Sequence, residues 1–373
     1  MKNLRRRRTL GMLALGAMLA GQLAAPMSFA ASDQAAAVIT RTPIQHVVVI
    51  IGENRTFDHT FGTYVPPPGQ TIWNLLSKGI IKADGEPGPK FNLAAQWKAS
   101  DTVTYSVHPT KTGPYSTLPR PNTDGAPTDA PFSSIAAAEA VEPDLPLANY
   151  NLLTIGGTDL PGHVIDTRFP AGLPNGPFDI SDFVSYDEYA GSPVHRFFQM
   201  WQQLDCDRSK ATTKNPSGCQ NDLFPWVEVS VGAGSNGKPR PTPFTDETTG
   251  EGSIAMGYYN VQAGDMSYFT ELASTYALSD NYHQAIQGGT GANHLAIGYG
   301  NTIFYANAKG NPSTPPVNQI ENPNPQKGTN NWYTQDGYGG GSYVNCSDAT
   351  QPGVAPVLNY LKSLPYKAFN PSS

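Results

Sequence analysis

The sequence predicts an α/β fold with a mostly parallel central sheet, and two stretches carry this prediction. Residues 47–51 (VVVII) are all β-branched, which is typical of a strand buried on both faces of a parallel sheet. Residues 266–277 have the apolar spacing of a helix, 276–282 indicate a short strand, and 294–299 indicate a second helix after a glycine-rich turn. This order is typical of crossover connections in a parallel sheet.

One further helix and several long loops complete the expected architecture. Residues 194–201 (VHRFFQMW) follow Pro193 and have the pattern of an amphipathic helix. The 37 glycines and 34 prolines concentrate in a few stretches, which we expect to be long loops: 66–68, 109–131, 232–252 and 309–341. The length of residues 31–373 suits one large α/β domain with insertions.

Residues 1–30 have the features of a secretory signal peptide. Lys2 and Arg5 to Arg8 form a positive first segment, residues 10–25 are apolar, and Ser28-Phe29-Ala30 fits a cleavage site between small residues. The apolar segment is too short and too rich in glycine for a membrane span. We therefore expect export to the periplasm or the medium.

The charge of the exported part excludes one class of partner. Five of the 24 basic residues and none of the 30 acidic residues lie in residues 1–30, which leaves 19 basic residues and a net charge of −11. No basic stripe indicates nucleic-acid binding. An acidic protein that handles anionic substrates needs a local positive group, and a bound metal ion supplies one.

Three cysteines are present, and two of them are plausible partners. Cys206 and Cys219 flank a short loop containing glycine and proline, which suits a disulfide in an oxidising compartment. Cys346 is left over, either as a free thiol or because its partner lies outside this chain.

A carboxylate and an amide follow the first predicted strand directly. Glu53 and Asn54 come after Gly52 at the carboxyl end of residues 47–51, where open α/β sheets bind ligands. Their oxygen atoms suit a hard divalent cation, although an ordinary polar turn would read the same way. Thr56 can cap a helix that carries Phe57 on its apolar side.

Three segments resemble one known family. ENRTFDHTFG at 53–62 resembles the ENRSFDHYFG signature of the bacterial phosphoesterase family, which contains non-specific phospholipases C and acid phosphatases. MGYYN at 256–260 resembles the family's MGYYD, and ALSDNY at 277–282 resembles its ALCDxY segment. The resemblance implies a three-layer, alkaline-phosphatase-like sandwich and the hydrolysis of phosphoric esters.

Thr290 is the candidate nucleophile. It follows Gly288-Gly289 in a predicted strand-to-helix turn, where a threonine is ordinarily a helix cap. This turn is similar to the G-[GP]-[ST] turn of the family, and Asn293 matches the family's asparagine, whereas Ala292 replaces its proline. The resemblance implies that Thr290 attacks phosphorus, and that Glu53, Asn54 and Thr290 bind a divalent metal of unknown identity.

Histidines supply the candidate acid. The resemblance implies that His163 binds a phosphate oxygen or protonates the leaving group, while His108 and His283 are alternatives for the same role. His59, within the signature, either lines the site or packs beneath it.

One departure from the family pattern leaves a rival hypothesis open. The family's later D-[DE]-x-x-G-x-x-DH-like motif, whose acidic pair completes the metal site, has no match here, so the chain resembles the N-terminal portion of a longer enzyme. Two ligands and Thr290 make a poor cage for a cation that prefers about six oxygens. The rival is a non-catalytic fragment or pseudoenzyme that binds phosphorylated ligands. The substrate, a phosphate monoester or a phospholipid, and the oligomeric state are not predicted.

Overall fold

The fold is described from a computed structural model of the chain. It describes residues 42–44, 46–52, 55–100, 106–121, 132–141, 143–147, 150, 154, 164–186, 188, 190, 193, 197–231, 252–287, 290–301, 307–311, 313 and 354–366. The chain divides into two units, Met1–Ile51 and Gly52–Ser373. Glu53, Asn54, His163 and Cys346 lie outside the described residues.

The first unit shows that the predicted strand at 47–51 is wrong for this structure. Its described residues contain no strand, and Val47, Val48, Val49 and Ile50 are 68–86% exposed. A β-branched run becomes a strand only when a neighbouring strand takes up its backbone hydrogen bonds. No strand pairs with this segment among the residues that the structure describes.

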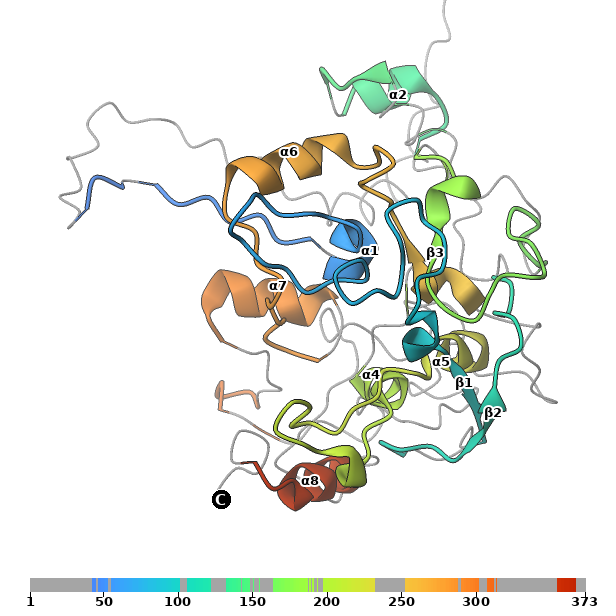
Figure 1. The fold of residues 1–373 in the computed structure, drawn as a ribbon. Coiled ribbons are helices and arrows are strands. Elements are labelled where there is room, and N and C mark those ends of the chain that lie inside the picture. The colour runs from blue at the N-terminus through green and yellow to red at the C-terminus, as the bar shows by residue number, and fades with distance from the viewer. Residues whose placement is uncertain are drawn as a thin grey trace, which may run out of the picture. The chain divides into compact units, whose positions relative to one another are not determined.

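The second unit is a mixture of helices and short strands (Figure 1). Its described elements are α1 (Phe57–Phe61), η1 (Phe91–Ala94), β1 (Trp97–Ala99), β2 (Lys111–Pro114), α2 (Ile135–Glu139), β3 (Phe178–Asp179), η3 (Ile180–Asp182), α4 (Phe197–Leu204), η4 (Arg208–Lys210), α5 (Phe224–Val231), η5 (Gly252–Met256), β4 (Gly257–Tyr258), α6 (Ser267–Thr275), α7 (Thr290–Tyr299) and α8 (Val354–Ser363). Among them, no helix is long and apolar enough to cross a bilayer.

The described strands form two small sheets. β1 and β2 are antiparallel, whereas β3 and β4 are parallel, with Phe178 opposite Gly257. The parallel pair joins segments about 80 residues apart, as an α/β fold requires. The mixture of helix and strand is therefore consistent with the predicted class, while the large parallel sheet and the three-layer sandwich stay predictions.

The predicted helices form, but the predicted second strand does not. The helix expected at 266–277 is α6, the one expected at 294–299 is α7 and begins four residues earlier, and the one expected at 194–201 is α4. Residues 276–282 contain no strand, and Tyr276 and Tyr282 are exposed, so that prediction is wrong. As at 47–51, no described strand offers this segment a partner.

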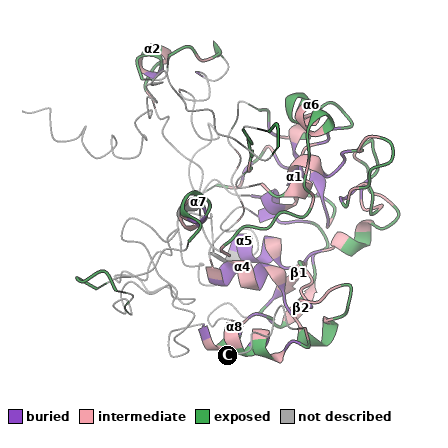
Figure 2. Ribbon diagram, turned by 90° about the vertical axis from the view of Figure 1, so that its left-hand side faces the viewer, coloured by how far each residue is buried: buried purple, intermediate pink, exposed green. Residues whose placement is uncertain are grey.

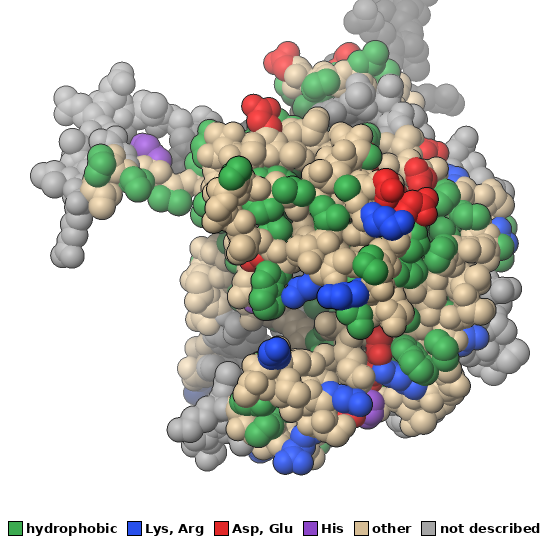
Figure 3. Space-filling model, viewed as in Figure 1, with side chains coloured by type: hydrophobic (Ala, Val, Ile, Leu, Met, Phe, Trp, Pro, Cys, Tyr) green, Lys and Arg blue, Asp and Glu red, His purple; other side chains and the backbone are tan. Residues whose placement is uncertain are grey.

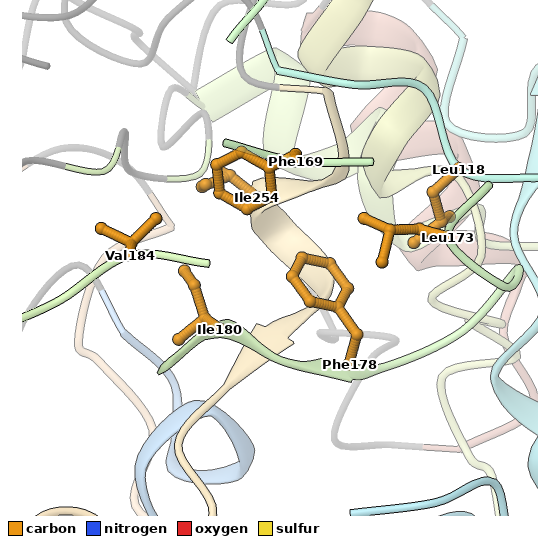
Figure 4. Packing of buried hydrophobic residues seen from close by; sticks show 7 residues of the cluster. All are labelled: Leu118, Phe169, Leu173, Phe178, Ile180, Val184 and Ile254. Atoms are coloured by element: carbon orange, nitrogen blue, oxygen red, sulfur yellow. The ribbon is translucent and has the colours of Figure 1, made fainter. Parts of the chain in front are cut away.

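Two hydrophobic clusters hold the centre of the second unit. One surrounds the parallel strands and contains Leu118, Phe169, Leu173, Phe178, Ile180, Val184 and Ile254, with the Phe169 and Phe178 rings edge to face (Figure 4). The other packs Trp226 and Val227 of α5 against Ala99 of β1. Figure 2 shows buried residues concentrated on α4 and α5, whereas α6 has none.

The predicted disulfide is confirmed. Cys206 and Cys219 are bonded and also form an isolated antiparallel bridge. Cys206 belongs to a third cluster, in which Val357 and Tyr360 of α8 pack close to the disulfide. The disulfide therefore closes the loop from 206 to 219, against which α8 packs.

Candidate functional site

Residues 56–62 of the signature form the two caps and the body of α1. Thr56 is the N-cap as predicted, with its backbone N–H donating to Nδ1 of His59 at 2.8 Å. The rings of Phe57 and Phe61 lie 5.5 Å apart on one side of the helix. A Cβ atom on Gly62 would collide with the carbonyl oxygen of Asp58, so glycine at the end of this signature has a steric reason.

His59 packs beneath the signature and does not line an open site. Its side chain is buried, and because Nδ1 accepts from Thr56, Nε2 carries the proton and donates to the carbonyl oxygen of Ala255 at 2.9 Å. Burial, with a smaller contribution from Arg55, lowers the pKa of His59 to about 4. The imidazole is therefore neutral at physiological pH and has a structural role.

Asp58 is a second titratable group within the signature. Its Oδ1 atom is buried and makes no hydrogen bond. Burial raises its pKa to about 6, and a hydrogen bond from the backbone of Leu75 opposes this shift. The carboxyl group therefore exchanges its proton close to neutral pH.

Two of the three family-like segments meet in the structure. The backbone N–H of Tyr259 donates to the carbonyl oxygen of His59 at 2.8 Å, and the Thr63 hydroxyl donates to Oδ1 of Asn260 at 2.9 Å. Asn260 is buried, and its own backbone N–H donates to Asp265. Segments almost 200 residues apart are thus joined, and MGYYN at 256–260 fixes the far side of the signature helix.

Another asparagine, which sequence reasoning missed, closes the signature helix. Asn74 is buried, and its side-chain amide donates to the carbonyl oxygens of Phe61 and Tyr64, both at 2.8 Å. The first is a carbonyl that the end of α1 leaves without an intrahelical partner, and the second belongs to the segment that follows the helix. A single asparagine in a polar stretch carries no periodic signal, so the sequence alone did not identify it.

Thr290 is the first residue of α7, whereas the sequence placed it in the turn before a helix expected at 294–299. The structure describes its backbone but not its side chain, and it leaves Gly288 and Gly289 outside the described residues. The predicted approach of Thr290 to Glu53 therefore stays a prediction. What the structure does describe is how the turn before the helix is held.

Asn293 clamps this turn. Its Oδ1 accepts from the backbone N–H of Ile286 at 3.0 Å, and its Nδ2 donates to the carbonyl oxygen of the same residue at 2.9 Å. The Asn293 side chain is buried one helical turn beyond Thr290. The two bonds close a loop from 286 to 293, which sets the point at which Thr290 enters the helix.

His108 belongs to an ion-pair network. Its Nδ1 lies 2.5 Å from the fully buried Asp205, and its Nε2 lies 3.7 Å from Asp207. Lys111 contacts Asp205 at 2.6 Å and Asp222 at 2.5 Å. Burial raises the pKa of Asp222 to about 6. Two carboxylates facing this histidine disfavour a phosphate there, and its proposed role at the ester stays a prediction.

The other polar candidates lie in the loop before α7. His283 is exposed, and its Nε2 lies 3.0 Å from Oδ1 of Asn281. Asp280 accepts a hydrogen bond from the backbone of Trp73 at 2.8 Å, which ties this loop to residues that follow the signature. His283 therefore remains accessible to a ligand, whereas Asp280 has a structural contact.

The expected metal ligands suit a hard cation in chemistry, although not in number. Glu53, Asn54 and Thr290 offer a carboxylate, an amide and a hydroxyl oxygen, so water or substrate would complete the shell. Among the residues that the structure describes, no group of three or more His, Cys, Asp or Glu side chains could hold a metal ion.

Comparison with known proteins identifies the family independently of the signature. A model of the phosphoesterase family matches residues 166–368, which is more than half of the chain. No curated protein and no solved structure matches the chain. The matched range begins after the signature at 53–62, and it includes MGYYN at 256–260, the loop before α7 and Thr290. The chain therefore belongs to the phosphoesterase family.

Proposed function

We propose that this chain is an exported, metal-dependent phosphoric ester hydrolase in which Thr290 is the nucleophile. Family membership supports hydrolysis of phosphate esters. The single observation that supports the choice of Thr290 is its place at the first residue of α7, in a turn that Asn293 clamps to Ile286. A nucleophile in such a turn meets the substrate beside the free N–H groups of a helix N-terminus.

The reaction would proceed through a covalent phosphothreonine. The Thr290 oxygen forms a bond to phosphorus, the bond from phosphorus to the ester oxygen breaks, and the hydroxyl proton of Thr290 passes to solvent water. The departing ester oxygen takes a proton from a histidine, for which His163 is the first candidate and His283 the second. Water then attacks phosphorus, which releases phosphate and restores the hydroxyl group.

Glu53, Asn54 and Thr290 would hold the divalent metal. When bound, the metal would lower the pKa of the Thr290 hydroxyl group and offset negative charge on the phosphoryl oxygens. The signature helix α1 is itself held by the contacts of His59 and Thr63 with residues 255–260. Export follows from the features of residues 1–30.

Two substrate classes fit this proposal. An acid phosphatase would accept small phosphate monoesters, and a phospholipase C would cleave a phospholipid at its phosphodiester. Steady-state assays on an aryl phosphate and on a phospholipid dispersion would separate these classes.

Substitution of Thr290 tests the proposed function. Thr290→Ala should abolish hydrolysis of an aryl phosphate, whereas Thr290→Ser should retain part of it because the hydroxyl group survives. The matched control is Thr275→Ala, which changes an exposed threonine at the end of α6 and should leave turnover unchanged. A chelator should abolish the activity, and added divalent ion should restore it. Thermal melts confirm that each variant folds.

Full turnover by Thr290→Ala would refute the covalent mechanism. Binding of a phosphate ester by the wild-type chain without any turnover would instead support the rival hypothesis, a non-catalytic member that retains the fold.

A further inference from the structure

A pocket of about 150 Å³ lies beside the antiparallel strands, and none of its lining residues belongs to α1 or α7. Its lining comes from β1, from the segment that follows β2, and from residues 165 and 171: Lys98, Tyr115, Ser116, Thr117, Leu118, Pro119, Arg120, Ile165 and Ala171. Two of these residues are cations and two carry aliphatic hydroxyl groups. None of the lining residues that the structure describes is acidic.

The pocket wall is held in place by its apolar members. Tyr115 and Leu118 are buried, and the backbone N–H of Tyr115 donates to the carbonyl oxygen of Gln96 at 3.0 Å. The backbone N–H of Leu118 donates to Leu173 at 3.0 Å. Between these anchors, Ser116 and Thr117 are exposed at the rim. A wall fixed on both sides presents its hydroxyl groups with little further loss of conformational entropy.

Both cations are held near the pocket by their own elements. Lys98 lies in β1 opposite Gly113 of β2, and its Nζ lies 5.4 Å from the centre of the Tyr115 ring. The backbone of Gly252 packs closely against the backbone of Arg120. Gly252 has a φ of +54°, and a Cβ atom there would collide with the Arg120 carbonyl oxygen. The backbone at both cations is therefore fixed before any ligand arrives.

The two cations in the pocket contrast with the net negative charge of residues 31–373. The exported part is strongly acidic, yet Figure 3 shows Lys and Arg side chains predominating in the lower half of the face shown. The lysine and arginine side chains of the pocket offer charged hydrogen-bond donors to an anion, and its serine and threonine offer neutral hydroxyl donors. Its volume is below the range of about 300–1,000 Å³ for sites that take drug-sized ligands, so its occupant is small.

We propose that this pocket is a second phosphate-binding site, in which Lys98 and Arg120 bind the phosphoryl group and Ser116 and Thr117 donate hydrogen bonds to it. The phosphoryl group comes either from inorganic phosphate, which the proposed reaction releases, or from a small organic phosphate. The site itself does not depend on Thr290, because none of its residues belongs to the proposed catalytic machinery.

Isothermal titration with inorganic phosphate, on the full chain in the presence of a chelator, tests the site. The Lys98→Gln/Arg120→Gln double variant should bind phosphate at least about tenfold more weakly than the wild type, because each lost cation removes a charge-assisted hydrogen bond. The matched control is Lys82→Gln, which removes an exposed lysine outside the pocket and should leave the affinity unchanged. A parallel titration with glycerol 3-phosphate separates the sources. Tighter binding of the ester would assign an organic phosphate, and equal binding would assign the free anion.

A second variant keeps the test decisive if the double variant melts early. Ser116→Asp places a negative charge at the exposed rim and should also weaken phosphate binding, whereas Ser313→Asp, at another exposed serine, should not. Unchanged phosphate affinity in a folded double variant or in Ser116→Asp would overturn the proposal. Hydrolysis of an aryl phosphate is measured separately, so an inactive chain that loses phosphate affinity on these substitutions would support the pocket and refute only the proposed function.

Discussion

Asp58 and His59 are neighbours in the signature, and burial shifts their pKa values in opposite directions. Burial disfavours the charged form of each group, which raises the pKa of Asp58 to about 6 and lowers that of His59 to about 4. The histidine has hydrogen-bond partners on both ring nitrogens, whereas Oδ1 of Asp58 has none. The signature thus contains one group that penalises folding at low pH and one that penalises it at high pH.

His59 leads to a prediction about folding stability at low pH. A lowered pKa means that its contribution to stability is present above the unfolded value of about 6.5 and is lost as the pH falls toward 4. We expect this loss to reach about 3 kcal/mol at most, since one pKa unit corresponds to about 1.4 kcal/mol. Urea unfolding of the wild type and of His59→Gln across this range measures it. The variant should be less stable at neutral pH, and the gap should narrow in acid. A gap that stays constant would contradict the neutral, buried assignment.

Asp58 leads to the opposite prediction, a loss of folding stability as the pH rises. A raised pKa means that the stability associated with protonated Asp58 is present below the unfolded value of about 3.9 and is lost as the pH rises through 6. Asp58→Asn removes this titration, so the variant should be more stable than the wild type at about pH 8, by roughly 1–2 kcal/mol, and equally stable near pH 4. Melting temperatures at the two pH values check this. A variant that is less stable at the higher pH would show that the charged carboxylate has a partner.

At the scale of elements, the start of α7 is the feature on which the proposed chemistry depends. The Asn293 clamp satisfies both backbone groups of Ile286 and is buried, so its loss leaves two polar groups without partners. A helix after the glycine turn could be predicted, at 294–299, but the clamp could not, because it joins a side chain to the backbone across a turn that has no periodic pattern.

We predict that Asn293→Ala lowers kcat by about tenfold to a hundredfold with little change in KM, because it misplaces the nucleophile without removing it. Asn293→Asp keeps the acceptor for the Ile286 N–H but cannot donate to its carbonyl oxygen, so it should restore only part of the rate. The control is Asn92→Ala, at an exposed asparagine in η1. Steady-state kinetics with thermal melts provide the measurement. A rise in KM at constant kcat would show that Asn293 contacts substrate instead.

At the scale of the whole molecule, local signals were predictable and long-range pairing was not. The helices α4 and α6 follow from apolar spacing, α7 follows from the glycine-rich turn before it, and the disulfide follows from a short loop between cysteines. Residues 47–51 and 276–282 have the composition of strands but do not form them, because a strand depends on a partner that its own sequence does not specify. The parallel pair of β3 and β4 was not predicted, because each strand is only two residues long and shows no recognisable strand pattern.

The same distinction applies to the candidate site. A turn leading into a helix near Thr290 was predictable because glycines mark it, although the helix begins four residues earlier than expected; the family resemblance supplied the role of Thr290. The contacts of His59 with Ala255 and of Thr63 with Asn260 join distant parts of the chain, and no local pattern announces them. These contacts join the signature helix to residues 255–260.

The most direct test of the central claim is to identify the residue that carries the phosphoryl group. The chain is mixed with an aryl phosphate and divalent ion, quenched in acid during turnover, digested and analysed by tandem mass spectrometry. We predict one phosphoryl group on the peptide that contains Thr290, absent from Thr290→Ala and from chelated enzyme. Turnover with no phosphorylated peptide, or with the phosphoryl group on another residue, would contradict the account.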